Sequence, residues 1–294
     1  HKTVRRQRQM CIRDSLISGL RYIDDEVESC VKNFFTTVCD NLFSSSDETT
    51  GKIAVEYDFN GSTMGYASFT IGSKPGGTNL TYGFSTREEL DADFRFASPV
   101  VTPMVFRAFE SENLESLEFG LKSDFFNGKA RANIAVFSYD YENLQFQATD
   151  PDPYRGGVAN IPNSEMDGVE IEFTALLGDS ITFDMNLGFI DTEVTSEYEV
   201  LDNVLAYQYF FEEEQERYDL REDVKGNMLA KTPEFTADAT LTYEGELASG
   251  NPINVILQFI RRGEFMQRVS NNPSVDTVPA VSYTHLTLPT NGLG

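Results

Sequence analysis

The sequence contains no tryptophan, only two histidines and three cysteines, and 23 basic residues against 47 acidic ones. The net charge of −24 argues against a nucleic acid as a partner, because no basic excess is present to displace the counterions of a phosphate backbone. No apolar run approaches the roughly 20 residues that a membrane-spanning helix needs. With 40% hydrophobic residues, the chain is also unlike an acidic disordered protein.

The two ends differ in composition from the rest of the chain. Residues 1–15 hold five basic residues and one acid, whereas residues 282–294 hold no charged side chain. Both ends resemble translated sequencing-adapter read-through, so we predict a non-native leader (1–15) and a non-native tail (282–294) around a native domain at 16–281. The alternative is a basic N-terminal arm and a neutral tail.

Histidine is absent from this predicted native domain, because His1 and His285 both lie in the two ends. Without an imidazole, the domain has no Ser-His-Asp or Cys-His relay and no His-ligated metal site. Such His-dependent sites are therefore excluded. Among the residues that we single out, we assign no catalytic residue, no metal ligand and no cofactor contact. Carboxylate-pair hydrolysis stays open as chemistry, since it needs only Asp and Glu.

Apolar and polar residues alternate in several long runs, which is the pattern of strands with one apolar and one polar side. The runs lie at about 53–59, 117–125, 169–177, 181–189 and 235–243. Short turn sequences separate neighbouring runs: Asn60-Gly61, Asn127-Gly128, Gly178-Asp179 and a connection at about 247–250. Such dipeptides supply the positive φ that two-residue hairpins require.

Short and long connections alternate along the chain. The long ones lie at roughly 25–51, 73–114, 142–166, 193–233 and 264–278, and loops of this length are uncommon in compact soluble domains. An outer-membrane barrel combines short periplasmic turns with long external loops, and its strands alternate lipid-facing apolar and lumen-facing polar residues. We therefore predict an all-β fold, a partial antiparallel up-and-down transmembrane β-barrel with nine strands and a tenth beginning near Val278.

Several segments resemble, in order, the C-terminal β-barrel of TonB-dependent outer-membrane receptors of the iron-complex type. The most specific is Tyr66-Ala67-Ser68-Phe69 followed by Lys74-Pro75-Gly76-Gly77 and Asn79, although Ser73 stands where the family often has an aromatic residue. Further matching segments lie at 19–25, 118–126, 135–145, 168–172 and 226–233. The family's N-terminal plug, its TonB box and the closing strands are absent from the sequence.

The resemblance implies a fragment of a receptor in the outer membrane of a Gram-negative bacterium, and not an enzyme. Such a receptor imports a ferric siderophore or a similar bulky nutrient with TonB-coupled energy. The implied partners are outer-membrane lipid, the TonB complex acting through the missing plug, and the iron–siderophore ligand.

Arginine and aromatic residues in the predicted loops are the candidate ligand contacts, because guanidinium groups pair bidentately with the carboxylates of anionic iron chelates. The candidates are Arg87, Arg95, Arg107, Tyr207 and Tyr209. Loop solubility is the alternative explanation for all of them.

Three other groups of residues have two interpretations each. The acidic run Glu212, Glu213, Glu214 and Glu216 could hold a cation such as Ca²⁺ or form a solvated loop or short helix. Cys30 and Cys39 could form a disulfide on the outer surface or stay two independent small residues. Tyr139, Tyr141 and Tyr198 could belong to an interfacial aromatic girdle or pack in the interior.

Other function classes remain open at this point. A passive outer-membrane porin shares the barrel pattern, and a secreted acidic β-sandwich binding protein or carboxylate glycosidase shares the composition. Against the last two, Glu170, Glu172 and Asp184 repeat on one face of neighbouring predicted strands, as a lumen lining would.

Overall fold

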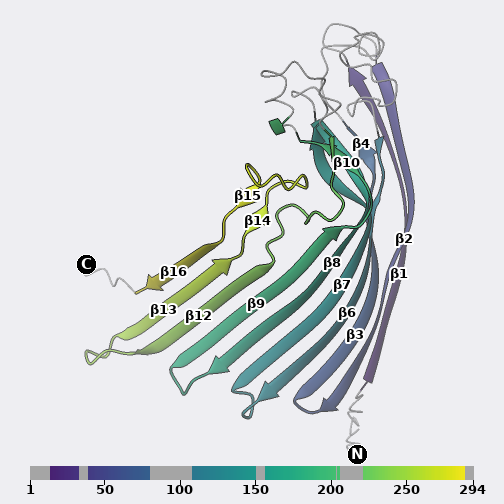
Figure 1. Cartoon of the computed structure of the whole chain (residues 1–294). Helices are drawn as coiled ribbons and strands as arrows, with labels where there is room; N and C mark the ends of the chain where they lie inside the picture. Colours follow the sequence, from purple (N-terminus) through teal and green to yellow (C-terminus); the bar gives the residue numbers. More distant parts are fainter. Residues whose placement is uncertain are drawn as a thin grey trace, which may run out of the picture.

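Figure 1 shows the computed structural model of the chain, which describes residues 14–32, 39–79, 108–149, 156–202, 204–205 and 221–288. In this part of the chain, ten strands form one antiparallel sheet. They are β1 (Asp14–Lys32), β2 (Cys39–Asn60), β3 (Thr63–Lys74), β6 (Glu112–Phe125), β7 (Ala130–Thr149), β8 (Gly156–Leu176), β9 (Ile181–Val194), β12 (Phe235–Glu246), β13 (Pro252–Arg262) and β16 (Val281–Thr287).

Each strand of this sheet pairs with the next one along the chain, so the topology is up-and-down throughout. The sheet is curved and open, with β1 at one edge and β16 at the other (Figure 1). The predicted fold class, a partial up-and-down barrel, is confirmed. The β-sandwich alternative is wrong, because the described residues form no second large sheet to cover the first. Among these residues, no helix has the length and apolar character needed to span a bilayer.

Six short strands lie in the connections on the side of the sheet that carries the long loops. They form three two-stranded pairs: β4 (Gly77–Thr78) with β5 (Ala108–Phe109), β10 (Glu199–Leu201) with β11 (Arg221–Asp223), and β14 (Phe265–Met266) with β15 (Thr277–Val278). The tenth strand of the large sheet begins at Val281, close to the predicted start near Val278. Val278 itself lies in β15 and pairs with Phe265 of β14.

The four short turns lie together at the opposite side of the sheet from the long loops (Figure 1). Asn127, Gly128 and Gly178 have positive φ as predicted, and Phe126 has it too (φ 53°). The turn at Asn60-Gly61 differs, since neither residue has positive φ. Instead, the Asn60 side chain accepts hydrogen bonds from the Ser62 backbone amide (2.9 Å) and hydroxyl (2.7 Å), which makes an Asx turn.

Four strands are longer than the sequence pattern predicted. β1, β2, β7 and β8 have 19, 22, 20 and 21 residues and cover most of the predicted loops 25–51 and 142–166. At about 3.3 Å per residue, β2 extends to about 70 Å, far beyond the ~25 Å apolar band of an outer-membrane barrel. Strand pairing continues above the band through backbone hydrogen bonds, but nothing there requires apolar alternation, so the periodicity signal ends early.

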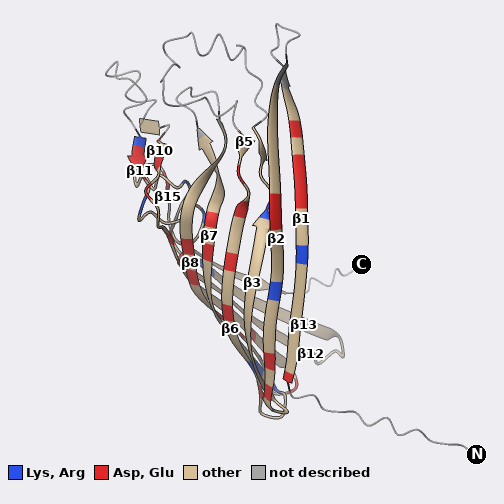
Figure 2. Ribbon diagram, turned by 90° about the vertical axis from the view of Figure 1, so that its right-hand side faces the viewer, with Lys and Arg blue, Asp and Glu red and all other residues tan. Residues whose placement is uncertain are grey.

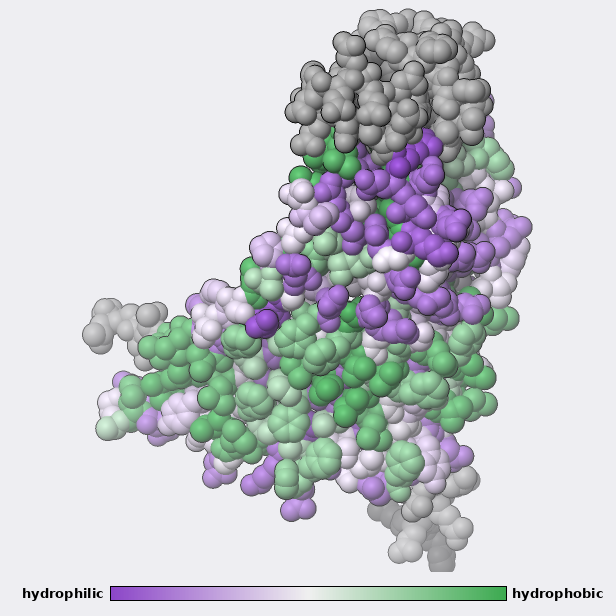
Figure 3. Space-filling model, viewed as in Figure 1, coloured by the Kyte–Doolittle hydropathy of each residue, from purple (hydrophilic) through white to green (hydrophobic). Residues whose placement is uncertain are grey.

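The two faces of the sheet differ in chemistry, because successive side chains in a strand point to opposite faces. We call the face that carries Leu117, Phe119, Val136 and Phe189 the outer face, and these side chains are 43–54% exposed. Hydrophobic residues gather in a band over the lower half of the sheet, with hydrophilic residues toward the loops (Figure 3). The opposite face, which we call the luminal face, carries Tyr66 and Glu118.

The predicted non-native ends are partly included in the sheet. Asp14 and Ser15 pair with Tyr57 and Glu56, and residues 282–287 pair with β13. An open sheet edge offers unpaired backbone groups to any extended segment, so this pairing leaves the proposed exclusion of both ends as a prediction.

Candidate functional site

Hydrogen-bonded carboxylates line the luminal face. Five of them each accept a hydrogen bond from a neutral side chain on a neighbouring strand. The pairs are Ser15 to Glu56 (2.8 Å), Tyr66 to Glu118 (2.6 Å), Asn133 to Glu172 (2.9 Å), Thr174 to Asp184 (2.8 Å) and Gln258 to Asp238 (3.1 Å). These contacts hold the acids in fixed positions without neutralising them, so the wall stays polar and negative.

Two aromatic rings on this luminal face cover glycines of the next strand. The Tyr66 ring lies where a Cβ on Gly120 would be, and the Phe137 ring lies where a Cβ on Gly168 would be. Tyr66 and Gly120 are direct cross-strand partners, as are Phe137 and Gly168. The glycines therefore let the rings lie flat against the wall, which also aims the Tyr66 hydroxyl at Glu118.

The Lys74-Pro75-Gly76-Gly77 segment starts the first described external connection. A Cβ on Gly76 would lie 2.6 Å from the Phe109 carbonyl oxygen, and one on Gly77 would lie 2.7 Å from the Phe109 ring. Asn79 then joins this connection to β8, since its Nδ2 donates to the Val158 carbonyl (2.9 Å) and its Oδ1 accepts from the Val158 amide (2.7 Å). The glycines thus allow close packing, and the asparagine fixes the loop to the wall.

A second set of loop segments packs together at the external ends of β9, β12 and β13. We call residues 195–202, 221–234 and 264–280 the external loop cluster. Its apolar centre joins buried side chains from these loops to the strand ends: Ile161, Val194, Val200, Val224, Leu229 and Val269. The Gly226-Asn227 segment bonds to β9, because Val194 and residues 226–227 exchange two backbone hydrogen bonds (2.8 and 2.9 Å). Gly226 needs its positive φ of 83° for this turn.

An ion-pair network crosses the external loop cluster. Arg268 donates from Nε to Asp276 (2.5 Å) and from Nη1 to Asp202 (3.1 Å), and both carboxylates are almost completely buried. Asn272 donates from Nδ2 to Asp202 (2.6 Å) and from its backbone amide to Asp276 (2.9 Å). One arginine therefore joins the loop after β9 to the loop after β13.

The charge state of Asp202 follows from these contacts. Burial alone would raise the pKa of this carboxyl group, but hydrogen bonds from Asn272 and the Val204 amide, together with the charge of Arg268, outweigh it and hold the pKa below its usual value. Asp202 is therefore ionised at neutral pH and paired.

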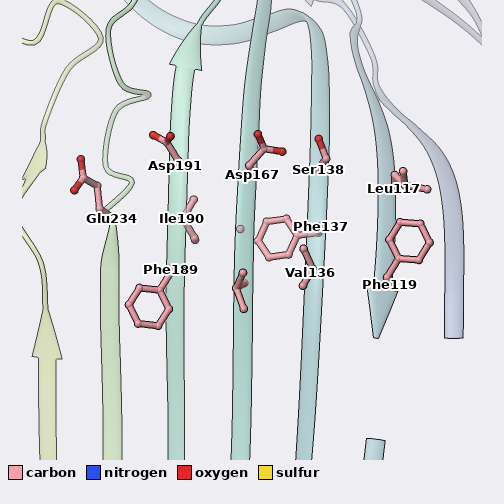
Figure 4. Close-up of a pocket in the computed structure, with 12 residues that line it drawn as sticks. Leu117, Phe119, Val136, Phe137, Ser138, Asp167, Phe189, Ile190, Asp191 and Glu234 are labelled. Atoms are coloured by element: carbon pink, nitrogen blue, oxygen red, sulfur yellow. The ribbon is translucent and has the colours of Figure 1, made fainter. Parts of the chain in front are cut away.

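A sharp chemical boundary crosses the outer face. The row Phe119, Val136, Val169 and Phe189 is apolar and runs in register across β6 to β9. Two residues closer to the loops in each strand lies the row of Leu117, Ser138, Asp167 and Asp191 (Figure 4). Four residues closer, a row of four acids crosses the same strands: Glu115, Asp140, Glu165 and Glu193. Figure 2 shows the acidic residues along β1, β2, β6, β7 and β8. The boundary gives the level at which the apolar band ends.

The predicted ligand contacts lie outside the described residues. This holds for Arg87, Arg95, Arg107, Tyr207 and Tyr209, and also for the acidic run Glu212, Glu213, Glu214 and Glu216. Within the described ranges, no group of three or more acidic, cysteine or histidine side chains is arranged to hold a metal ion.

Cys30 is disulfide-bonded. Its Cα lies opposite that of Asn41, and the Cα of Lys32 lies opposite that of Cys39, so Cys30 and Cys39 are two positions apart in register on paired strands. The side chain of Cys39 lies outside the described residues, so the identity of the partner stays a prediction.

The predicted aromatic girdle is wrong for the three tyrosines named for it. Tyr139 and Tyr141 lie on the luminal face, where the Tyr139 ring stacks on Phe137 with 4.7 Å between ring centroids. Tyr198 belongs to the external loop cluster and packs edge-on against Phe146. The interior-packing alternative is the one observed.

Sequence reasoning missed Asp202, Arg268 and Asp276. Arg268 and Asp202 are 66 residues apart in the chain, so no local pattern reveals their pairing. One signal was present, because Asn271-Asn272-Pro273-Ser274 has turn-forming composition and could have indicated an ordered loop.

The sequence matches the model of one known protein family. A model described as "TonB dependent receptor-like, beta-barrel" matches residues 13–288. The chain belongs to the TonB-dependent receptor β-barrel family. The predicted resemblance is confirmed, and so is the predicted location, since TonB-dependent receptors are β-barrel proteins of the Gram-negative outer membrane. Proteins of this family are transport receptors.

Individual receptors are similar to this chain at low identity. "Probable TonB-dependent siderophore receptor PiuA" of Acinetobacter baumannii is 24% identical over 180 residues, which are 60% of this chain and 21% of PiuA. The chain thus spans about a fifth of the length of this curated relative.

Solved structures of TonB-dependent receptors share the fold. The ferric yersiniabactin uptake receptor FyuA from Yersinia pestis matches with a TM-score of 0.67 and 15% identity, over 94% of this chain and 35% of FyuA. The crystal structure of PiuA from A. baumannii gives 0.63 and 17%, over 92% and 34%. The copper transporter OprC gives 0.60 and 16%, over 94% and 37%.

Proposed function

We propose that this chain forms part of the wall and outer mouth of a receptor that imports a ferric siderophore or a similar bulky nutrient with TonB-coupled energy. Membership of the TonB-dependent receptor family carries the proposal. The names of the similar receptors support an iron complex as the ligand, since FyuA is a ferric yersiniabactin uptake receptor and PiuA a siderophore receptor. OprC is a copper transporter, so import of another metal is the alternative to import of iron.

The geometry of the described residues suits this role. The outer face supplies an apolar band for outer-membrane lipid, and the luminal face supplies a fixed polar wall. The external connections are anchored at their bases, by Asn79 in one place and by Arg268 in another. Anchored bases would hold ligand-contacting loop residues over the mouth at defined positions.

We further propose that Arg87, Arg95, Arg107, Tyr207 and Tyr209 contact the ligand, and that Cys30 pairs with Cys39 at the external end of β1 and β2. The TonB complex would act through the N-terminal plug of the complete receptor. Binding and release of the ligand, and not a chemical conversion, is the proposed activity.

An uptake experiment tests the proposal. A complete receptor gene that carries this segment is expressed in a Gram-negative host without siderophore receptors of its own, and uptake of radiolabelled ferric siderophores is measured with and without a functional tonB gene. We expect saturable iron uptake that stops when tonB is deleted. Free entry of small solutes that is independent of TonB, without chelate uptake, would instead identify a passive porin. Uptake of copper but not iron would change the cargo and keep the mechanism.

A further inference from the structure

Two short turns of the large sheet contain the same reactive dipeptide, asparagine followed by glycine. Asn60-Gly61 joins β2 to β3, and Asn127-Gly128 joins β6 to β7. All four residues are exposed. In such a pair, the glycine nitrogen can attack the asparagine side chain, because no Cβ crowds the nitrogen. The two pairs share this chemistry, so a difference in their reactivity comes mainly from the geometry of the turns.

The Asn60 side chain lies in an attack geometry. Its Oδ1 accepts hydrogen bonds from the backbone amide of Ser62 (2.9 Å) and from the Ser62 hydroxyl (2.7 Å). The resulting Asx turn folds the side chain back along its own backbone as a β-turn would, which brings Cγ next to the nitrogen of Gly61. No hydrogen bond within the described residues uses the Gly61 amide proton, and a Cβ on Gly61 would meet nothing within 4 Å. The nucleophile is therefore open, and the electrophile is held beside it.

Asn127 differs from Asn60 in both respects. The Gly128 amide donates to the Phe125 carbonyl at 3.1 Å, so the attacking nitrogen of this pair is engaged in the turn. Asn127 and Gly128 both have positive φ, 59° and 81°, unlike Asn60 and Gly61. In the part of the chain that the structure describes, no donor is hydrogen-bonded to the Asn127 side-chain oxygen. Asn127 is therefore a matched internal reference with the same dipeptide and without the geometry.

We propose that Asn60 is a site of spontaneous deamidation promoted by its own turn. The Gly61 nitrogen loses its proton to hydroxide and forms a bond to Cγ of Asn60, and the bond from Cγ to Nδ2 then breaks and releases ammonia. The product is a five-membered succinimide. Water opens either of its two carbonyls, which leaves aspartate or isoaspartate at position 60. The sequence consumes one water, releases one ammonia and needs no redox partner.

Ser62 is the residue that assists this reaction. When nitrogen attacks Cγ, negative charge develops on Oδ1, and both Ser62 donors already point at that atom. Donors fixed in this way stabilise the charged intermediate more than the neutral amide. Losing one such donor costs about 10²–10³ in rate in a water-excluded active site, and the exposed turn gives a smaller effect. We expect an advantage of about tenfold over Asn127.

The modification would change the charge at the periplasmic end of the wall. Asn60 lines a hollow of about 380 Å³ together with Asp58, Lys122 and Arg131. Deamidation adds a negative charge there. An isoaspartate also lengthens the main chain by one carbon, but the pairing of β2 with β3 is already irregular between Asp58 and Asn60. The sheet should therefore keep its pairing while the charge of the hollow changes.

Peptide mapping of a complete receptor that carries this segment tests the proposal. The folded receptor is incubated in detergent in water labelled with oxygen-18, which marks deamidation that occurs during the incubation. Mass spectrometry with electron-transfer fragmentation then counts aspartate and isoaspartate at positions 60 and 127. We expect about tenfold faster reaction at position 60 in the folded receptor and similar rates at both positions in urea.

Three variants separate the contributions within the turn. Ser62→Ala removes the hydroxyl donor and keeps the amide donor, so we expect the rate at position 60 to fall by about threefold. Ser62→Thr keeps a hydroxyl group and should keep the rate. Gly61→Ala places a methyl group beside the attacking nitrogen, where the fold has room for it, and should slow the reaction at position 60 only.

Three results would overturn the proposal. They are equal or slower reaction at position 60 than at position 127 in the folded receptor, the same ratio in the folded and the urea-unfolded receptor, and an unchanged rate in folded Ser62→Ala. Heat-modifiable migration in electrophoresis shows whether each variant is folded, and the wild-type comparison decides if a variant does not fold. The reaction does not depend on the import activity, so a receptor that imports no chelate tests it equally well.

Discussion

Replacing Arg268 with alanine should open the external loop cluster and leave the large sheet folded. The guanidinium group contacts Asp276 at 2.5 Å and Asp202 at 3.1 Å, and these carboxylates are only 1% and 0% exposed. Removal of one partner from a buried ion pair costs about 3–5 kcal/mol, because a buried charge is left uncompensated. Arg268 itself is 30% exposed, and Asn272 still donates to both carboxylates, so we expect about 3 kcal/mol, the lower end of this range.

Hydrogen exchange measured by mass spectrometry on a complete receptor in detergent is the assay. A local loss of 3 kcal/mol raises exchange in the peptides covering 221–234 and 264–280 by about 100-fold, because each 1.4 kcal/mol is a factor of ten. Arg268→Lys keeps the charge but loses the two-pronged geometry, so we expect an intermediate effect. Arg131→Ala removes the exposed ion pair with Asp124 and serves as the control, with little change expected.

Unchanged exchange in residues 264–280 of the Arg268→Ala variant would refute this reasoning. Equal loss of protection in the paired strands β9 and β12 would contradict the second part of the prediction, that the large sheet stays folded. The ion-pair network would then stabilise the large sheet as well as the loops. A combined Arg268→Ala and Asp276→Asn variant should recover part of the protection from exchange, because the buried and unpaired negative charge of Asp276 is then removed.

Three further predictions concern single contacts. The folded-state pKa of Asp202 lies below the ordinary value of about 3.9, so its stabilisation of the external loop cluster is complete above about pH 4 and is lost as the pH falls through that lower pKa. Hydrogen exchange corrected for intrinsic rates should show this loss of protection in acid. The Asp202→Asn variant should no longer show the acid dependence. Gly120→Ala should displace the Tyr66 ring and lower the unfolding free energy by about 1–3 kcal/mol in denaturant titrations, whereas Gly19→Ala, with nothing within 4 Å, should not. Asn79→Ala should raise exchange in residues 156–160, because both hydrogen bonds to β8 are lost, and Asn79→Asp should restore only the one it can accept.

The strands of the large sheet could be predicted from the sequence, but their full length could not. Alternation at 181–189 and 235–243 gave strands with the correct faces, because contact with lipid on one side demands an apolar residue at every second position. Above the apolar band that demand ends. There, Asp24 and Asp47 face each other across β1 and β2 on the outer face, and only backbone pairing shows that the strands continue.

Loop anchoring obeys a different rule from wall formation. Many sequences satisfy the lipid requirement, because any apolar residue serves at an outer position, whereas a charged one there is costly. The anchors depend instead on particular groups far apart in the chain: Asn79 on Val158 at a separation of 79 residues, and Arg268 on Asp202 at 66. A pattern search finds neither, since each exists only once the wall has brought the loops together. It follows that a substitution such as Arg268→Ala should separate the two properties, giving a barrel that folds and inserts normally while its external loops open.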